Sequence, residues 1–144
     1  MKTIFLTILF ASGTTFAMPN IPDGSYEGKA SWKDSQGNQG RYDISIEVEK
    51  EKVRSTYDYG SSTIVYEFTA RADANGFFAV ESNGQDVGSG YCMNVQCHYT
   101  AKFGDMELEE TLTFWQGRLY RVESKKVNGL FVAWEEATKK VEMK

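Results

Sequence analysis

Apolar and polar residues alternate along much of this chain. In the segment RYDISIEVEK, residues 41–50, an apolar side chain stands at every second position from Tyr42 to Val48, with polar ones between. Successive side chains of a strand leave opposite faces of a sheet, so this period of two predicts a strand with one buried and one wet face. The same period recurs, less regularly, in three further segments: 53–59, 64–70 and 106–114.

Short runs of turn-forming residues separate the alternating segments. Examples are SQGNQG, DANG, SNGQD, WQGR and VNGL. Asn-Gly steps and similar pairs supply the positive backbone angles that tight hairpins require. No proline follows Gly24, which suits a hydrogen-bonded ladder in which every missing N–H would break a cross-strand bond.

The predicted fold is all-β, an antiparallel up-and-down β-barrel of about eight to ten strands. Closure removes the exposed edges that so long a meander would otherwise present. A β-sandwich is the alternative. The last segment, FVAWEEATKKVEMK, contains Glu-Lys pairs at helical spacing, yet Leu130, Val132 and Trp134 alternate. We predict a strand there.

The chain begins with the pattern of a secretory signal peptide. Residues 1–17 carry an early positive charge, a short apolar run and a small-residue end at Ala17. The apolar run is shorter than the roughly 20 residues that span a bilayer. We therefore expect cleavage after Ala17, an extended segment at 18–23, a single β-barrel domain at 24–144, and a periplasmic or secreted protein.

Charge narrows the classes of partner. The formal net charge is -4, and the basic residues are scattered. A phosphate-facing patch for nucleic acid is not expected on such a chain. The outward positions of the predicted strands carry acidic residues rather than a lipid-facing apolar band, so we expect no membrane insertion. The expected partner is a small hydrophobic or amphiphilic molecule, or an envelope or extracellular protein.

Both cysteines and the single histidine lie in the segment GSGYCMNVQCHYTA. A disulfide, a metal site and a variant haem-attachment sequence are the competing interpretations. A two-residue turn at Asn94 and Val95 places Cys92 opposite Cys97, within disulfide reach. Cys97 and His98 are adjacent in a strand and point to opposite faces, which disfavours a shared metal ion. We predict a disulfide, no metal and no cofactor.

Recognisable catalytic motifs are missing. The sequence has no G-x-S-x-G, no phosphate-binding loop and only one imidazole for a Ser-His-Asp site. We therefore expect that the protein is not an enzyme. The least favoured alternative is acid or base chemistry by Glu110, Glu123 or His98.

Two hairpin turns, at Gln116-Gly117 and Asn128-Gly129, gather charges among large apolar groups on one face. They place Arg121 opposite Glu136. If this face is the barrel interior, the arginine can bind a ligand carboxylate in a bidentate manner. Alternatively the ions are structural, or the face is wet. The predicted ligand-binding residues are Arg121, Tyr42, Tyr66, Trp134 and Glu136.

The opening strand DGSYEGKASW and the late Arg121 resemble the lipocalin and wider calycin pattern. In that family a Gly-x-Trp on the first strand packs near a basic residue from a final strand. Here Tyr26 stands in the place of the tryptophan. The resemblance implies a cup-shaped barrel that binds an apolar ligand.

Taken together, these patterns predict an exported, soluble binding protein with a small apolar or amphiphilic ligand in the barrel lumen. The alternative is a solid barrel whose stapled hairpin, Gly88 to His98, docks into a protein target as an inhibitor or interaction module.

Overall fold

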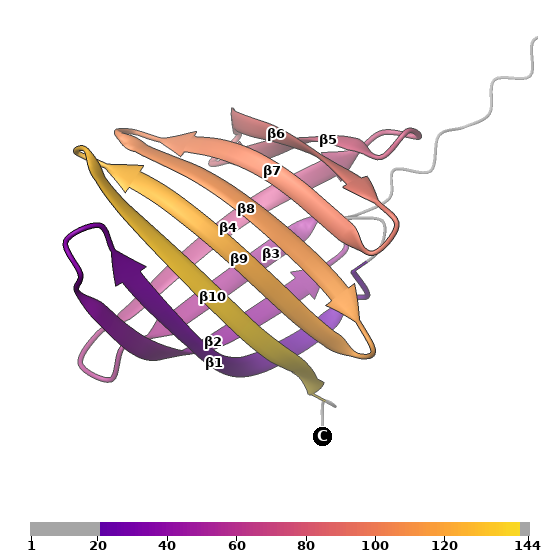
Figure 1. Ribbon diagram of the computed structural model, residues 1–144. Coiled ribbons are helices and arrows are strands. Elements are labelled where there is room, and N and C mark those ends of the chain that lie inside the picture. Colours follow the sequence, from indigo (N-terminus) through magenta and orange to yellow (C-terminus); the bar gives the residue numbers. More distant parts are fainter. Residues whose placement is uncertain (1–20, 142–144) are drawn as a thin grey trace, which may run out of the picture.

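The computed structural model describes residues 21–141, and this part of the chain consists of ten antiparallel strands without a helix. Figure 1 shows them wrapped into a barrel. The strands are β1 (Gly24–Asp34), β2 (Gln39–Glu49), β3 (Lys52–Asp58), β4 (Thr63–Ala72), β5 (Phe77–Ser82), β6 (Gln85–Met93), β7 (Gln96–Phe103), β8 (Met106–Trp115), β9 (Arg118–Val127) and β10 (Leu130–Val141). The expected signal peptide, residues 1–17, and the first part of the extended segment at 18–23 lie outside the described residues.

Each strand pairs with the next one along the chain, and β1 pairs with β10 to close the barrel. At this seam Ser25 lies opposite Val141 and Asp34 opposite Val132. The predicted up-and-down barrel is confirmed, and the sandwich alternative is wrong. The final segment is a strand, as predicted, because in β10 it pairs with both β1 and β9.

Hairpin turns fix the registers that the sequence predicted. Asn83, Gln116 and Asn128 have φ near 50°, and a glycine with positive φ follows each of them. Two successive residues in this left-handed region form the turn whose twist matches that of the flanking strands. Arg121 consequently lies opposite Glu136, as the sequence indicated.

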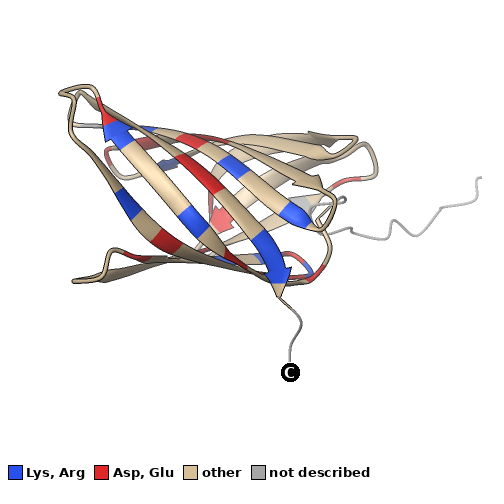
Figure 2. Cartoon of the chain, turned by 60° about the horizontal axis from the view of Figure 1, so that its bottom comes forward, with Lys and Arg blue, Asp and Glu red and all other residues tan. Residues whose placement is uncertain are grey.

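Side chains of alternate residues fill the interior. In β2, Tyr42, Ile44, Ile46 and Val48 are buried while the residues between them are exposed or half-buried. The outer wall carries charges of both signs, which Figure 2 shows interspersed along the strands. No helix long and apolar enough to cross a membrane occurs in the part of the chain that the structure describes.

The barrel wall is incomplete beside β4. This strand pairs with β3 from Thr63 to Thr69 but with β5 only from Thr69 to Ala72, because β5 is only six residues long. The first half of β4 therefore faces an opening. Ile64 and Tyr66 share the inward register of buried Phe68, yet both remain exposed there.

The predicted disulfide is present. Cys92 and Cys97 lie opposite each other in the β6–β7 hairpin with a Cα–Cα distance of 4.0 Å. Cys97 is buried, whereas the neighbouring imidazole of His98 points outward, where its Nδ1 lies 3.0 Å from the hydroxyl of Thr111. The two side chains therefore occupy opposite faces, as expected for adjacent strand residues.

The opening aromatic residue does not pair with the late arginine in the way the calycin resemblance implies. Tyr26 packs edge-on against Phe114, with ring centroids 6.2 Å apart, and its hydroxyl donates to the carbonyl of Pro22. The guanidinium of Arg121 instead lies over the ring of Tyr57. The barrel is confirmed, but this detail of the resemblance is not.

Candidate functional site

Arg121, from the middle of β9, projects into the lumen and is only 1% exposed. Its Nε donates to Glu136 Oε2 at 2.5 Å. Its Nη1 and Nη2 donate to Ser55 Oγ and Tyr57 Oη, each at 2.9 Å. A buried guanidinium is tolerated when its charge is paired and its nitrogens are hydrogen-bonded; Arg121 is paired, and each of its three nitrogens donates one bond.

Glu136 is held from two sides. The hydroxyl of Tyr42 donates to its Oε1 at 2.5 Å, while Arg121 occupies its Oε2. Burial, together with this negative neighbour, raises the pKa of Tyr42, so the tyrosine remains a neutral donor. Strands β2, β3, β9 and β10 thus meet through one buried polar network.

Two further carboxyl groups lie among the inward-facing residues. Glu110 on β8 is directly opposite Glu123 on β9, and both are buried. Glu110 Oε2 lies 3.7 Å from Arg121 Nη1. Burial raises the pKa of Glu110, and the nearby Glu123 carboxylate raises it further, against the opposing effect of Arg121.

Lys125 completes the polar lining. Its ammonium lies 2.6 Å from Glu123 Oε1. Three aromatic rings surround the same ammonium at centroid distances of 4.5 Å for Trp134, 5.2 Å for Tyr66 and 5.7 Å for Tyr57. We call these three rings, together with Glu123, the lysine cage. A cation held over ring faces beside a carboxylate is stabilised by both interactions.

A cavity of about 360 Å³ lies within this part of the barrel. We call it the lumen cavity. It reaches the side opening, since the first half of β4 and the β5–β6 turn at Ser82 and Asn83 contribute to its lining. Its interior wall combines aromatic or apolar side chains with the buried charges: Tyr57, Tyr66, Phe68, Tyr99, Phe103, Met106, Leu108, Glu110, Arg121, Glu123 and Lys125.

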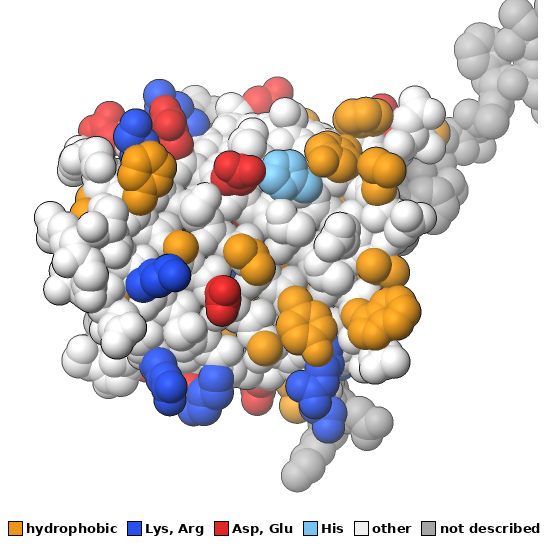
Figure 3. Space-filling model, in the orientation of Figure 1, with side chains coloured by type: hydrophobic (Ala, Val, Ile, Leu, Met, Phe, Trp, Pro, Cys, Tyr) orange, Lys and Arg blue, Asp and Glu red, His pale blue; other side chains and the backbone are white. Residues whose placement is uncertain are grey.

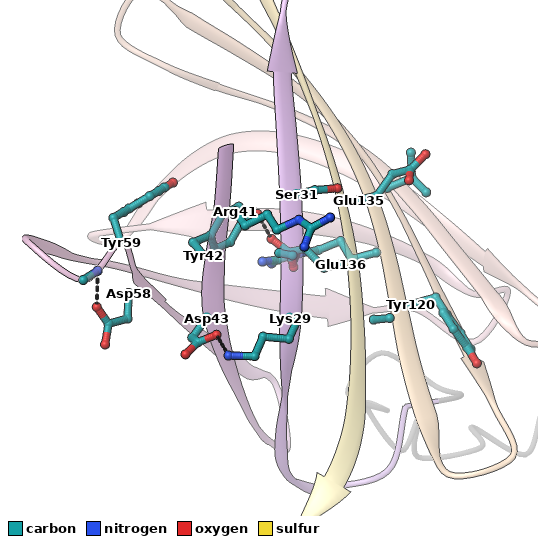
Figure 4. A pocket seen from close by; sticks show the side chains of 15 residues that line it. Lys29, Ser31, Arg41, Tyr42, Asp43, Asp58, Tyr59, Tyr120, Glu135 and Glu136 are labelled. Carbon is teal, nitrogen blue, oxygen red and sulfur yellow. Dashed lines mark hydrogen bonds and ion pairs between the residues drawn. The ribbon is translucent and has the colours of Figure 1, made fainter. Parts of the chain in front are cut away.

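A larger depression of about 890 Å³ lies over β1, β2, β9 and β10. Figure 4 shows its side chains, with the buried pair Tyr42 and Glu136 at its centre. Outward-facing charged residues line much of the rest, including Lys29 and Asp43, which pair with each other. Because it opens widely to solvent, we regard the smaller lumen cavity as the stronger candidate site.

The residues predicted from the sequence occupy connected positions. Arg121, Tyr42 and Glu136 belong to one hydrogen-bonded network, while Tyr66 and Trp134 belong to the lysine cage. Ligand binding by these five residues stays a prediction.

The predicted set of ligand-binding residues omits four residues that complete the site. They are Ser55, Tyr57, Tyr99 and Lys125. Lys125 could have been predicted, because it follows Arg121 and Glu123 at the same strand period. The alternation of 53–59 puts Ser55 and Tyr57 on one face, but nothing in the sequence pairs them with Arg121, since 66 and 64 residues separate them from it.

The chemistry of the site is that of binding groups. Among residues 21–141, no cluster of three His, Cys, Asp or Glu side chains is arranged to hold a metal ion. Aromatic rings, buried carboxyl groups and two cations offer hydrogen bonds, cation–π contacts and apolar surface to a guest molecule.

Comparisons with known proteins identify the fold alone. Neither a family model nor a curated protein matches this chain. Among solved structures, the S-type phycobiliprotein lyase CPES from Guillardia theta superposes with a TM-score of 0.67 at 12% identity, covering 85% of this chain and 89% of the lyase. A protein of unknown function of the DUF3598 family, from Nostoc punctiforme, gives a TM-score of 0.66 at 9% identity. That match covers 90% of this chain and 51% of the DUF3598 protein, so this chain spans about half of its length.

Proposed function

We propose that this protein is a binding protein that holds a small amphiphilic ligand in the lumen cavity. The observation that carries the proposal is a cavity of about 360 Å³ inside the closed barrel, with an aromatic wall and buried charges. Pockets that take small molecules are usually apolar concavities of roughly 300–1,000 Å³ with a few fixed polar groups. A barrel of similar fold is found in a phycobiliprotein lyase, which is consistent with ligand handling in general.

Tyr66 would contact the ligand near the opening, because its ring lines the lumen cavity there. Trp134 would act through Lys125, whose ammonium it holds. Arg121, Tyr42 and Glu136 would form a rigid base below the ligand. The arginine has donors on all three nitrogens engaged within the protein, so its geometry supports a structural role more than a seat for a ligand carboxylate.

The proposed working environment is periplasmic or extracellular. The Cys92–Cys97 disulfide supports this, because disulfides persist mainly in oxidising compartments. The signal-peptide pattern of residues 1–17 supports it independently.

The expectation that the protein is not an enzyme gains no support from the fold, since a similar barrel occurs in a lyase. Binding remains our proposal because Arg121 is paired with Glu136, and Lys125 is paired with Glu123 inside the lysine cage. Acid or base chemistry, the alternative, would use Glu110 or Glu123, the buried acidic groups that line the cavity.

The test uses the neutral fluorescent probe N-phenyl-1-naphthylamine, together with native mass spectrometry of the purified protein. We expect fluorescence enhancement in the wild type. Met106→Trp, which replaces a thioether chain on the cavity wall by a bulky indole ring, should weaken binding by about ten-fold or more. Glu107→Trp adds the same ring to the outward face of the same strand and should leave binding unchanged. Equal binding by wild type and Met106→Trp, with no copurified ligand, would refute a lumen site.

A second candidate, docking of the stapled hairpin into a protein, is favoured by exposed apolar side chains around it. Phe77, Tyr91, Met93 and Val95 are all exposed. Figure 3 shows apolar side chains at the β6 and β7 end of the face, near the His98 imidazole. Large exposed apolar groups of this kind mark interaction surfaces. Tyr91→Ser with Met93→Ser should abolish capture of a specific partner without lowering the melting temperature, whereas Gln96→Ser should not.

A further inference from the structure

Two buried carboxyl oxygens beside the lumen cavity lack a normal hydrogen bond: Glu110 Oε1 and Glu123 Oε1. The second lies 2.6 Å from the ammonium of Lys125, which leaves Glu110 Oε1 as the unexplained atom. Glu110 is 2% exposed and lines the cavity. The carboxyl of Glu123 and the ring of Tyr99 lie near it, yet no hydrogen bond of ordinary geometry reaches its Oε1. A buried acceptor without a donor is costly, so such an atom indicates a missing proton or a missing ligand donor.

The charges around the cavity leave one negative charge uncompensated when every group is ionised. Arg121 pairs with Glu136, and Lys125 pairs with Glu123. Glu110 is then the third carboxylate, with only the more distant contact to Arg121 at 3.7 Å. One additional positive charge in the cavity, either a proton or a ligand cation, makes the lumen neutral.

The lysine cage shows which chemistry this region accepts. The ammonium of Lys125 is held by Glu123 and by the rings of Tyr57, Tyr66 and Trp134. The rings of Tyr57 and Tyr66 also line the lumen cavity, as do Glu110 and Glu123. A second cation in this cavity therefore meets the same two kinds of partner, ring faces and a carboxylate.

We propose that the ligand of the lumen is a monocationic amphiphile, whose ammonium group binds Glu110 beside the rings of Tyr57 and Tyr66. This proposal rests on the proposed function. The apolar part of the ligand lies against Phe68, Phe103 and Leu108. An anionic ligand is disfavoured, because it would face two carboxyl groups while each nitrogen of Arg121 already donates a hydrogen bond within the protein.

The unliganded protein meets the same charge requirement with a proton. The groups that face Glu110 are Arg121, Glu123, Glu136, Tyr57 and Tyr99. Burial and the neighbouring carboxylates keep the pKa of Glu110 raised in spite of Arg121. A bound cation then displaces this proton into the solvent, so affinity for the cation increases with pH.

Access is available through the incomplete wall. The lumen cavity extends to the first half of β4 and to the β5–β6 turn, where β4 pairs with β3 but not with β5. The side chain of Lys125 is 11% exposed at this cavity and is long and flexible. An entering amphiphile can therefore pass the lysine without opening a strand pair.

The experiment compares three molecules with the same eight-carbon chain: octyltrimethylammonium, octanol and octanoate. Binding is measured by isothermal calorimetry, in two buffers of different ionisation enthalpy. We expect octyltrimethylammonium to bind at least about ten-fold more tightly than octanol, and octanoate to bind more weakly than octanol. The cation should release up to one proton, and octanol none.

The decisive variant is Glu110→Gln, which keeps the shape of the side chain and removes its charge. It should lose the preference for the cation and the proton release while still binding octanol. Glu109→Gln changes the adjacent, outward-facing residue of β8 and should behave as wild type. Glu123→Gln, which should reduce the preference in the same direction, serves if Glu110→Gln does not fold.

The outcomes separate the two proposals. If none of the three molecules binds, and the probe of the previous subsection also fails, the lumen is not a binding site. If octanol or octanoate binds as tightly as the cation, the binding function stands and the cationic class is wrong. Retention of cation preference by Glu110→Gln would likewise overturn the assignment of this residue.

Discussion

Single residues have the largest effects on the free energy of unfolding of this barrel, because five charged side chains point into it. The pairing of Arg121 with Glu136 is complete at short distance, and Tyr57 and Ser55 bond the remaining guanidinium nitrogens. Burial lowers the pKa of Arg121, but Tyr57 and the surrounding carboxylates outweigh that effect, so the residue stays charged. Such a network is stable only while every member is present.

Replacement of Arg121 by methionine tests this dependence. The change leaves Glu136 and Glu110 without their cation in the barrel interior, so we expect a loss of about 3–5 kcal/mol in the free energy of unfolding, measured with urea. As a control, Lys29→Met removes the ammonium from an exposed ion pair with Asp43 and should change stability little. A wild-type midpoint for Arg121→Met would show that the network is not structural.

Glu110 gives the stability a pH dependence of known sign. Its pKa is near 4.5 in the unfolded chain and higher in the folded barrel. Its contribution is therefore complete below pH 4.5 and is lost as pH increases through the folded value. A folded pKa one unit above the unfolded one lowers the free energy of unfolding at high pH by about 1.4 kcal/mol.

We therefore expect the stability of the wild type relative to Glu110→Gln to fall as pH increases, as measured by urea unfolding across pH 4 to 9. Glu107→Gln, whose exposed partner Lys102 keeps its charge over this range, should show no such trend relative to wild type. A difference that grows with pH would mean that Glu110 is ionised and well paired in the folded state.

At the scale of the element, each hairpin is set by its own turn, and two local features add constraints. The disulfide joins directly opposed residues of β6 and β7. In β1, Gly28 lies so close to β10 that an added Cβ would stand 2.0 Å from the carbonyl oxygen of Ala137. Both features therefore act on the pairing of neighbouring strands.

Removal of the disulfide by Cys92→Ala with Cys97→Ala should lower stability by about 2 kcal/mol, because the short loop no longer restricts the unfolded chain. The fold should persist, since the hairpin register is also fixed by its ladder. Thermal unfolding by circular dichroism measures the effect. Met93→Ala with Gln96→Ala, in the adjacent exposed pair, provides the control.

Gly28→Ala should cost about 1–3 kcal/mol, because the β1–β10 seam must shift to admit the methyl group. Lys29→Ala, at the next and outward-facing position, should be nearly neutral. Chemical denaturation compares the two variants. Equal stability would show that the seam adapts without loss.

At the scale of the whole molecule, closure makes every strand a neighbour of two others. The β1–β10 seam joins the two ends of the described barrel and completes the wall around the lumen. Because damage to one strand exposes the common interior, we expect cooperative unfolding.

Glu135→Pro tests the coupling between the seam and the rest of the barrel. Glu135 lies in β10 between Ser31 of β1 and Val122 of β9, and proline removes its ladder donor. We expect earlier melting, with far-UV and near-UV circular dichroism changing together. Glu135→Thr retains the N–H and should melt like wild type. Separate transitions for the two signals would show that the seam unfolds independently.

Local pattern determined the strands, the hairpin registers and the disulfide of this protein. Alternation identifies the inward face of a strand, and a tight turn fixes which residues lie opposite each other, so Arg121 with Glu136 and Cys92 with Cys97 were both predictable. These relations involve neighbouring strands only, and their physical cause lies within a few residues of the turn.

Only the tertiary structure decided which inward-facing side chains contact each other across the lumen. The bonds of Arg121 to Ser55 and Tyr57 cross the lumen between distant strands, and no turn specifies them. The lumen cavity and its opening depend on the short β5 and on how the closed wall curves. Curvature and closure are properties of all ten strands together, so the pattern of any one segment does not contain them.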